Sequence, residues 1–144
     1  MTTDDRHLLI ERFLGNWFPR GVDSISERLP GGDLNDVYRV DCQDQAFVLR
    51  IYNKAATHAM VECEHAGVGQ FGSRLVEVPV PIPANNGGTV VQEDDLVASM
   101  LPFIDGYRVD ITEDVELRMA AEMLARLHSV GETIECPSPR PGYP

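Results

Sequence analysis

Arg50 is the residue whose surroundings point most directly to chemistry. It follows Val48 and Leu49 and precedes Ile51, so it interrupts a strand that is otherwise apolar. Because a buried guanidinium without a partner is costly, Arg50 needs an anion close by. A carboxylate on a neighbouring helix or the phosphate of a ligand would supply it. The alternative is an arginine on the solvent side of a half-exposed strand.

A glycine turn lies upstream of this strand. Gly31, Gly32 and Asp33 stand between two predicted strands, and Asn35 follows them closely. Backbone amides approach phosphate oxygens only where no side chain intervenes, and glycine leaves that space free. The turn is therefore a candidate phosphate lid, with an ordinary hairpin turn as the alternative.

Two glutamates of the next predicted helix could pair with Arg50. Glu64 lies beside the buried stripe of that helix, whereas Glu62 lies roughly 160° away at about 100° per residue. Only one of them can face the strand, so the sequence favours Glu64 over Glu62. The stripe consists of Val61, Val68 and Phe71.

The hydrophobic pattern predicts three helices and five strands around these residues. Thr112 is the candidate N-cap of the last helix. An α+β fold accounts for the order: a five-stranded antiparallel sheet with one packed helix, plus an N-terminal and a C-terminal helix. The helices are expected at 4–18, 55–72 and 113–129, and the strands at 24–29, 37–41, 47–52, 89–92 and 96–102.

The order of these segments resembles the N-terminal lobe of aminoglycoside phosphotransferase and choline kinase-like proteins, which share the protein kinase-like fold. The resemblance covers about residues 20–130 and rests on five short segments in the family's order. They are Gly-Asp-Leu-Asn with Val-Tyr-Arg-Val at 32–40, Phe-Val-Leu-Arg at 47–50, Val-Pro-Val-Pro at 78–81, Leu-Pro-Phe-Ile-Asp-Gly at 101–106 and Leu-Ala-Arg-Leu-His at 124–128.

This resemblance implies a nucleotide site. The turn containing Gly31, Gly32, Asp33 and Asn35 would cover the phosphates of ATP. Arg50 would contact the α- and β-phosphates and pair with a helix glutamate. Protein kinases use lysine at this place. Arginine differs from lysine in reach and in the fork geometry of its guanidinium, so Arg50 would serve the ion pair more than the phosphates.

The resemblance also implies where adenine would lie. Met100, Leu101 and Phe103 belong to the segment whose backbone would meet the adenine edge, with Met100 as a gatekeeping side chain. Leu49 and Val37 would supply apolar walls. A strand end followed by a turn at 105–106 is the alternative interpretation of the same segment.

Residues that phosphoryl transfer requires are missing from the sequence. The reaction needs an aspartate that orients the acceptor hydroxyl, and an asparagine and an aspartate that hold magnesium. In relatives these lie well downstream of the Leu-His helix end, in a His-Gly-Asp-type loop and at a later aspartate. In this sequence no aspartate stands two residues after any of the four histidines. We therefore expect no catalytic and no metal-binding residue here. ATP binding is expected to be weak, and magnesium to bind only together with a C-terminal lobe.

Composition limits the remaining possibilities. A chain of 144 residues fits one domain, expected over 1–136, with a helix at 1–20, the sheet and its helix at 22–104, a helix at 112–130 and a proline-rich tail at 137–144. The net charge of −11 argues against a nucleic-acid partner. A membrane span, a signal peptide and a CxxC pair are absent, so a cytoplasmic protein is expected. The three cysteines are Cys42, Cys63 and Cys136.

The C-terminal helix suggests a second kind of function. Its apolar side chains would pack on a second lobe in relatives, and exposed apolar surface favours association. We expect a homodimer, with exchange of residues 113–130 as one route to it. The first alternative is a nucleotide-binding lobe, truncated or expressed as a fragment, that is not catalytically competent alone. The second is a non-enzymatic association module that dimerises through its C-terminal helix without nucleotide binding. A small α+β binding protein that resembles kinases by chance is the third alternative.

Overall fold

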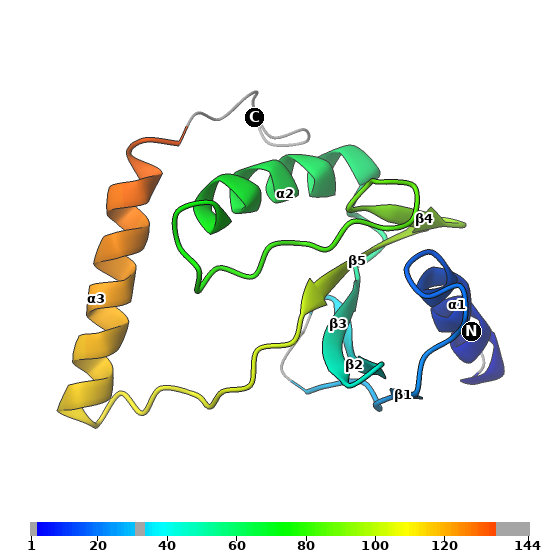
Figure 1. Ribbon diagram of the computed structural model, residues 1–144, viewed down its shortest axis with the longest axis horizontal. Coiled ribbons are helices and arrows are strands. Elements are labelled where there is room, and N and C mark those ends of the chain that lie inside the picture. Colours follow the sequence, from blue (N-terminus) through cyan, green and yellow to red (C-terminus); the bar gives the residue numbers. More distant parts are fainter. Residues whose placement is uncertain (1–2, 31–33, 135–144) are drawn as a thin grey trace.

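The computed structural model describes residues 3–30 and 34–134, and Figure 1 shows their arrangement. The predicted α+β fold with one five-stranded antiparallel sheet is confirmed. The tail predicted at 137–144 lies outside the described residues. The elements in chain order are α1 (Thr3–Gly15), β1 (Ser24–Ile25), β2 (Asp36–Cys42), β3 (Gln45–Ile51), α2 (His58–Gly72), β4 (Val91–Glu93), β5 (Leu96–Pro102) and α3 (Asp114–Gly131).

The sheet has the strand order β1-β2-β3-β5-β4, and every neighbouring pair is antiparallel. β3 is therefore the central strand, as its apolar sequence predicts. Arg50 lies opposite Val37 of β2 on one side and opposite Ser99 of β5 on the other. Successive side chains of a strand point to opposite faces, so this register decides which residues share a face with Arg50.

Helix α1 covers one face of the sheet (Figure 1). Its apolar residues recur at helical spacing and meet the alternate residues of β2, β3 and β5 that point the same way. Phe13, Leu49 and Met100 are fully buried there. The buried cluster on this face consists of Leu9, Ile10, Phe13, Leu14, Trp17, Tyr38, Val40, Leu49, Ile51, Ala84, Val91, Ala98 and Met100.

Helix α2 lies on the opposite face and is attached by fewer buried side chains. Thr57 caps its N-terminus, where the Thr57 hydroxyl accepts a hydrogen bond from the Met60 amide at 3.3 Å. Among its described residues only Val61 and His65 are buried. Val61 belongs to a small apolar cluster with Tyr52, Val90 and Val97.

Two predicted strands are shorter than the sequence suggests. β1 ends at Ile25, although the Ser26 and Leu29 amides still donate to carbonyls of β2, at Arg39 and Val37. The register shifts by one residue between these two bonds, which interrupts the regular ladder. β4 begins at Val91 rather than at residue 89.

Helix α3 projects away from the sheet, as Figure 1 shows, and none of its described residues is buried. Its predicted N-cap was wrong: Glu113 is the cap residue and makes no side-chain capping bond. The Thr112 hydroxyl donates instead to the Asp110 carboxylate at 2.7 Å, because Asp110 closes the turn before the helix. No helix in the described part of the chain is long and apolar enough to cross a membrane.

Candidate functional site

Arg50 and Glu64 meet on the α2 face of the sheet. Arg50 Nη1 lies 3.8 Å from Glu64 Oε1, and the exposed fractions of the two side chains are 38% and 35%. The guanidinium also lies over the Tyr52 ring, 5.9 Å from its centroid. Glu62 points elsewhere on α2 and pairs with His58 at 3.3 Å. The structure therefore places Glu64, rather than Glu62, beside a cation that stays accessible to a ligand.

An apolar strip continues from Arg50 along the same face. Val37 lies opposite Arg50, and Val48 lies two residues before it on β3 and opposite Leu101 of β5. All three apolar side chains are partly exposed. A flat apolar surface next to a cation suits a ligand with a planar apolar part and an anionic part.

The structure does not support the gatekeeping role expected for Met100. Met100 pairs with Leu49, and both side chains are fully buried in the cluster under α1. They point away from Arg50 because the pleat alternates along each strand. Leu101, one residue further, lies on the Arg50 face instead. Met100 and Leu49 are therefore not placed to contact a ligand beside Arg50.

The glycine turn contributes one described residue to the site. Gly31, Gly32 and Asp33 lie outside the described residues. The Asn35 side-chain carbonyl accepts a hydrogen bond from the Asn53 amide at 3.2 Å. This bond ties the start of β2 to the segment just after β3, so Asn35 anchors the end of the turn.

Phe103 follows β5, and its ring makes a cation–π contact with Arg39, a residue that the sequence analysis did not single out. The Phe103 amide donates to the Ala46 carbonyl at 3.1 Å, which extends the β3–β5 pairing. The Arg39 guanidinium lies 4.6 Å from the Phe103 ring centroid, and Arg39 also pairs with Asp41 at 2.8 Å. Val37 and Arg39 alternate with Tyr38 in β2, and the register of β2 with β3 places both on the Arg50 face.

A buried polar cluster next to Arg50 was also not predicted from the sequence. Tyr52, His65, Thr89 and Ser99 come from four separate segments, and their polar atoms meet between α2 and the sheet. Burial, with a smaller contribution from the Arg50 charge, lowers the pKa of His65 despite the opposing charges of Glu64 and Glu62. A lone histidine in a helix gives no sequence signal that distinguishes this position from a surface position.

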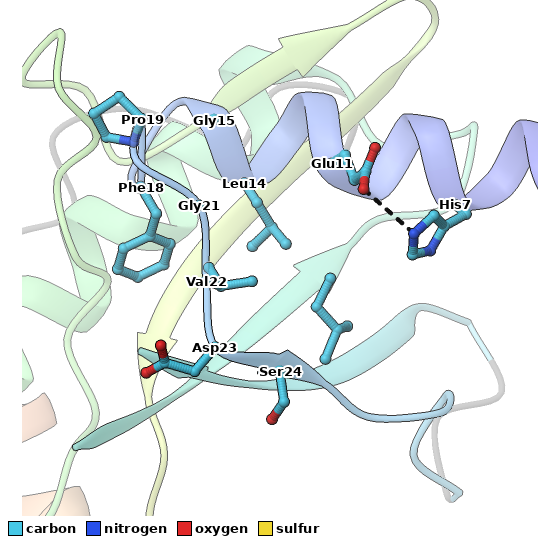
Figure 2. Close-up of a pocket in the computed structure, with 11 residues that line it drawn as sticks. His7, Glu11, Leu14, Gly15, Phe18, Pro19, Gly21, Val22, Asp23 and Ser24 are labelled. Atoms are coloured by element: carbon cyan, nitrogen blue, oxygen red, sulfur yellow. Dashed lines mark ion pairs between the residues drawn. The ribbon is translucent and has the colours of Figure 1, made fainter. Parts of the chain in front are cut away.

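A separate cavity of about 510 Å³ lies between α1 and β1, and Figure 2 shows its lining. Leu14, Phe18 and Val22 form its apolar part, and the ion pair of His7 with Glu11 stands at its rim at 3.3 Å. None of the predicted site residues lines it. Within 3–30 and 34–134, no group of three His, Cys, Asp or Glu side chains could hold a metal ion.

Known structures share this fold. An amicoumacin kinase in complex with AMP-PNP, Ca²⁺ and Ami aligns over 97% of this chain and 45% of its own, with a TM-score of 0.72 and 13% identity. A spectinomycin phosphotransferase in complex with ADP and spectinomycin aligns over 74% of this chain and 32% of its own, with a TM-score of 0.58 and 14% identity. At these identities the likeness establishes the fold: the kinase-like N-terminal lobe.

The family follows from the sequence itself. The sequence profile of the phosphotransferase enzyme family matches residues 26–144, and the chain belongs to that family. A comparison with curated protein sequences gives no match. The chain spans less than half the length of the solved relatives named above.

Proposed function

We propose that this chain is the nucleotide-binding lobe of an ATP-dependent phosphotransferase that acts on a small molecule. The observation that carries the proposal is the accessible Arg50–Glu64 pair at 3.8 Å beside an apolar strip on the same sheet face. Two solved neighbours of the same fold hold ADP or AMP-PNP.

The described residues fit a nucleotide in two respects. Arg50 offers a partly exposed guanidinium to phosphate oxygens, and Glu64 lies beside it on the same face. Val37, Val48 and Leu101 offer an apolar surface to the base. The backbone from Leu101 to Phe103 would meet the base edge, while Gly31, Gly32, Asp33 and Asn35 would cover the phosphates. Asn35 would act mainly by anchoring that turn to Asn53.

A nucleotide bound with magnesium would supply the transferable phosphoryl group, and this lobe would bind and orient it. The described residues include no acidic cluster suited to the metal. The carboxylates that orient the acceptor and hold magnesium are supplied by a second lobe in this fold. We therefore propose weak nucleotide binding and no phosphoryl transfer by the chain alone.

The test is a titration of the 144-residue chain with Mg-ATP, followed by calorimetry and by the NMR signal of the Arg50 Nε–H. We expect saturable binding of low affinity and a shift of that signal. Arg50→Gln should weaken binding about tenfold, or ~1.4 kcal/mol, because one charged contact is lost.

Arg126→Gln is the matched control, because Arg126 is an exposed arginine of α3 that pairs with Glu77 far from the proposed site. It should bind Mg-ATP as the wild type does. An equal loss in both variants, or no binding up to millimolar Mg-ATP in the wild type, would contradict the proposal.

Association through α3 is the second candidate function. An apolar groove of about 520 Å³ runs along α3 and the segment before it. Met119 is 65% exposed and Leu124 is 52% exposed. The apolar stripe of an amphipathic helix normally packs against other elements, so this exposure is unusual. A second copy of the chain that covers this face would make it a homodimer, and exchange of residues 113–130 would be one route.

Sedimentation equilibrium at micromolar concentration tests this candidate. The wild type should be dimeric, and Leu124→Glu should be monomeric because it places a charge in the covered face. Arg118→Glu changes the charge on the same helix without removing an apolar contact and is the control. A monomeric wild type would exclude the dimer and leave nucleotide binding unaffected.

A further inference from the structure

His65 is a buried polar residue with partners on both ring nitrogens. Its Nδ1 lies 2.8 Å from Thr89 Oγ1, and its Nε2 lies 3.4 Å from the Tyr52 hydroxyl. The Tyr52 hydroxyl in turn lies 3.4 Å from Ser99 Oγ, and the Ser99 side chain is fully buried. A hydroxyl can donate or accept, so either neutral tautomer of His65 is satisfied.

This cluster matters because few side chains of α2 are buried against the sheet. A surface helix is usually held by a broad apolar stripe. In α2 the buried side chains among the described residues are Val61 and His65, one turn apart. Val61 supplies apolar contact without direction, whereas the hydrogen bonds of His65 fix both the rotation and the register of the helix.

The Arg50–Glu64 pair cannot position α2 by itself. Its two charges are 3.8 Å apart and each side chain is more than one-third exposed. Exposed pairs of this kind contribute little to structure. The same Tyr52 that binds His65 through its hydroxyl lies under the Arg50 guanidinium through its ring. The buried cluster and the ion pair are therefore connected through one side chain.

We propose that His65 is a positioning residue: its bonds to Thr89 and Tyr52 hold α2 so that Glu64 reaches Arg50, and its protonation weakens that pair and nucleotide binding. The proposal rests on the nucleotide-binding function proposed above, since it assigns a pH-dependent regulation to the same site.

The charges around His65 set the direction of the effect. The charges of Glu64 and Glu62 act on it from its own helix, and the charge of Arg50 acts on it from β3. Tyr52, Thr89 and Ser99 contribute hydroxyl groups. A proton on His65 places a second cation near Arg50 and gives Glu64 a competing partner. It also requires both hydroxyl partners to accept, which removes the freedom of the neutral state.

The pH window follows from linkage. Burial lowers the pKa of folded His65 below its ordinary value of 6.5. The unfolded chain therefore binds this proton more readily, so the neutral cluster contributes fully above pH 6.5 and its contribution is lost as pH falls through the lower folded pKa. Attachment of α2 and nucleotide affinity in the folded chain should both decline as pH falls through the folded pKa of His65, which lies below 6.5.

The first experiment needs no nucleotide. Histidine ring NMR of the 144-residue chain gives the titration midpoint of His65, while the Glu64 carboxyl carbon and the Arg50 Nε report the ion pair. We expect a midpoint below 6.5 and changes in both ion-pair signals with that same midpoint. A His65 titration that leaves the Arg50 and Glu64 signals unmoved would overturn the proposal.

The second experiment compares Mg-ATP affinity at pH 7.5 and at a pH below the His65 midpoint that the NMR titration gives. His65→Gln offers a polar group near Nε2 but takes up no proton, and His58→Gln is the matched control on the exposed side of α2. Phosphate groups protonate at about pH 6 and affect all variants alike. We expect the wild type and His58→Gln to lose affinity severalfold more than His65→Gln.

The outcomes separate this proposal from the one it rests on. Equal pH dependence in all three proteins would overturn the positioning role, even if each binds Mg-ATP. No binding by the wild type at either pH would overturn the nucleotide site and its control together, while the NMR titration would still decide whether His65 governs the ion pair. If His65→Gln does not fold, His65→Asn, which preserves the Nδ1 position, replaces it.

Discussion

The two faces of the sheet are built differently. The α1 face is closed by a continuous apolar cluster in which Phe13, Leu49 and Met100 are fully buried. The α2 face has a small apolar cluster, a buried polar cluster around His65 and a half-exposed ion pair. Burial and accessible charge are thus separated: one face supplies most of the buried apolar surface, and the other leaves a cation accessible and holds a helix by fewer buried side chains.

The largest effect that can test this separation is the loss of a side chain from the α1 face. Phe13→Ala removes a fully buried ring at the centre of that cluster. We expect a loss of about 3–5 kcal/mol in the free energy of unfolding, since Phe-to-Ala changes in cores cost this much. Denaturant unfolding measures it.

Val61→Ala is the counterpart on the α2 face, where the buried apolar cluster is smaller and the side chain removed is smaller too. It should cost clearly less than Phe13→Ala. Equal losses would show that both faces contribute alike to stability and would break the comparison.

A second, smaller effect tests how closely α2 is packed at its C-terminal end. A Cβ added to Gly72 would overlap Val80 Cγ2, and Val80 belongs to the extended segment after the helix. Gly72→Ala should therefore destabilise the fold by about 1–3 kcal/mol, as overpacking does, although alanine favours helix. Thermal unfolding measures the difference.

Gly69 provides the control for this prediction. A Cβ there meets nothing within 4 Å, so Gly69→Ala should be neutral or stabilising. The double variant Gly72→Ala with Val80→Ala should regain part of the loss. Equal behaviour of both glycine variants would mean that α2 is not packed against residues 78–80 as described.

The sequence predicted the layers of the fold because its period is clear in the long elements. Alternation in β2 and β3 and the apolar spacing of α1 correspond to the buried clusters. Arg50 stood out as a cation within an apolar strand, and the angular spacing of Glu62 and Glu64 indicated the one beside it. These are local signals with a fixed geometry.

The rest of the site depends on tertiary placement. The pattern did not show on which face Met100 lies, since β5 is apolar on both faces and its alternation is hidden. The partners of His65 come from residues 13 and 24 positions away along the chain. Thr112 is of a residue type that often caps helices, but its hydroxyl donates a hydrogen bond to Asp110 in the preceding turn. No spacing rule covers such contacts.

The smallest effect concerns the ion pairs that join α1 to the β4–β5 hairpin. Arg12 donates to Glu93 at 2.8 Å and to Asp94 at 2.9 Å, and all three side chains reach solvent. The Arg12 guanidinium, through these hydrogen bonds and its charge, holds the pKa of Asp94 below its ordinary value of 3.8. Folding therefore gains from the charged carboxylate above that value and loses the gain as pH falls through the lower folded pKa.

Arg12→Gln should accordingly lower the thermal midpoint slightly at pH 7, by less than Gly72→Ala, because exposed pairs are screened by water. The difference from the wild type should shrink at high salt and vanish below the folded pKa of Asp94. Thermal unfolding at pH 7 and pH 2 measures it, with Lys54→Gln as the control that breaks the neighbouring Lys54–Asp95 pair at 2.7 Å without touching α1. A loss at pH 7 comparable with that of Phe13→Ala would mean that α1 is held by charge rather than by burial, and the contrast between the two faces would no longer hold.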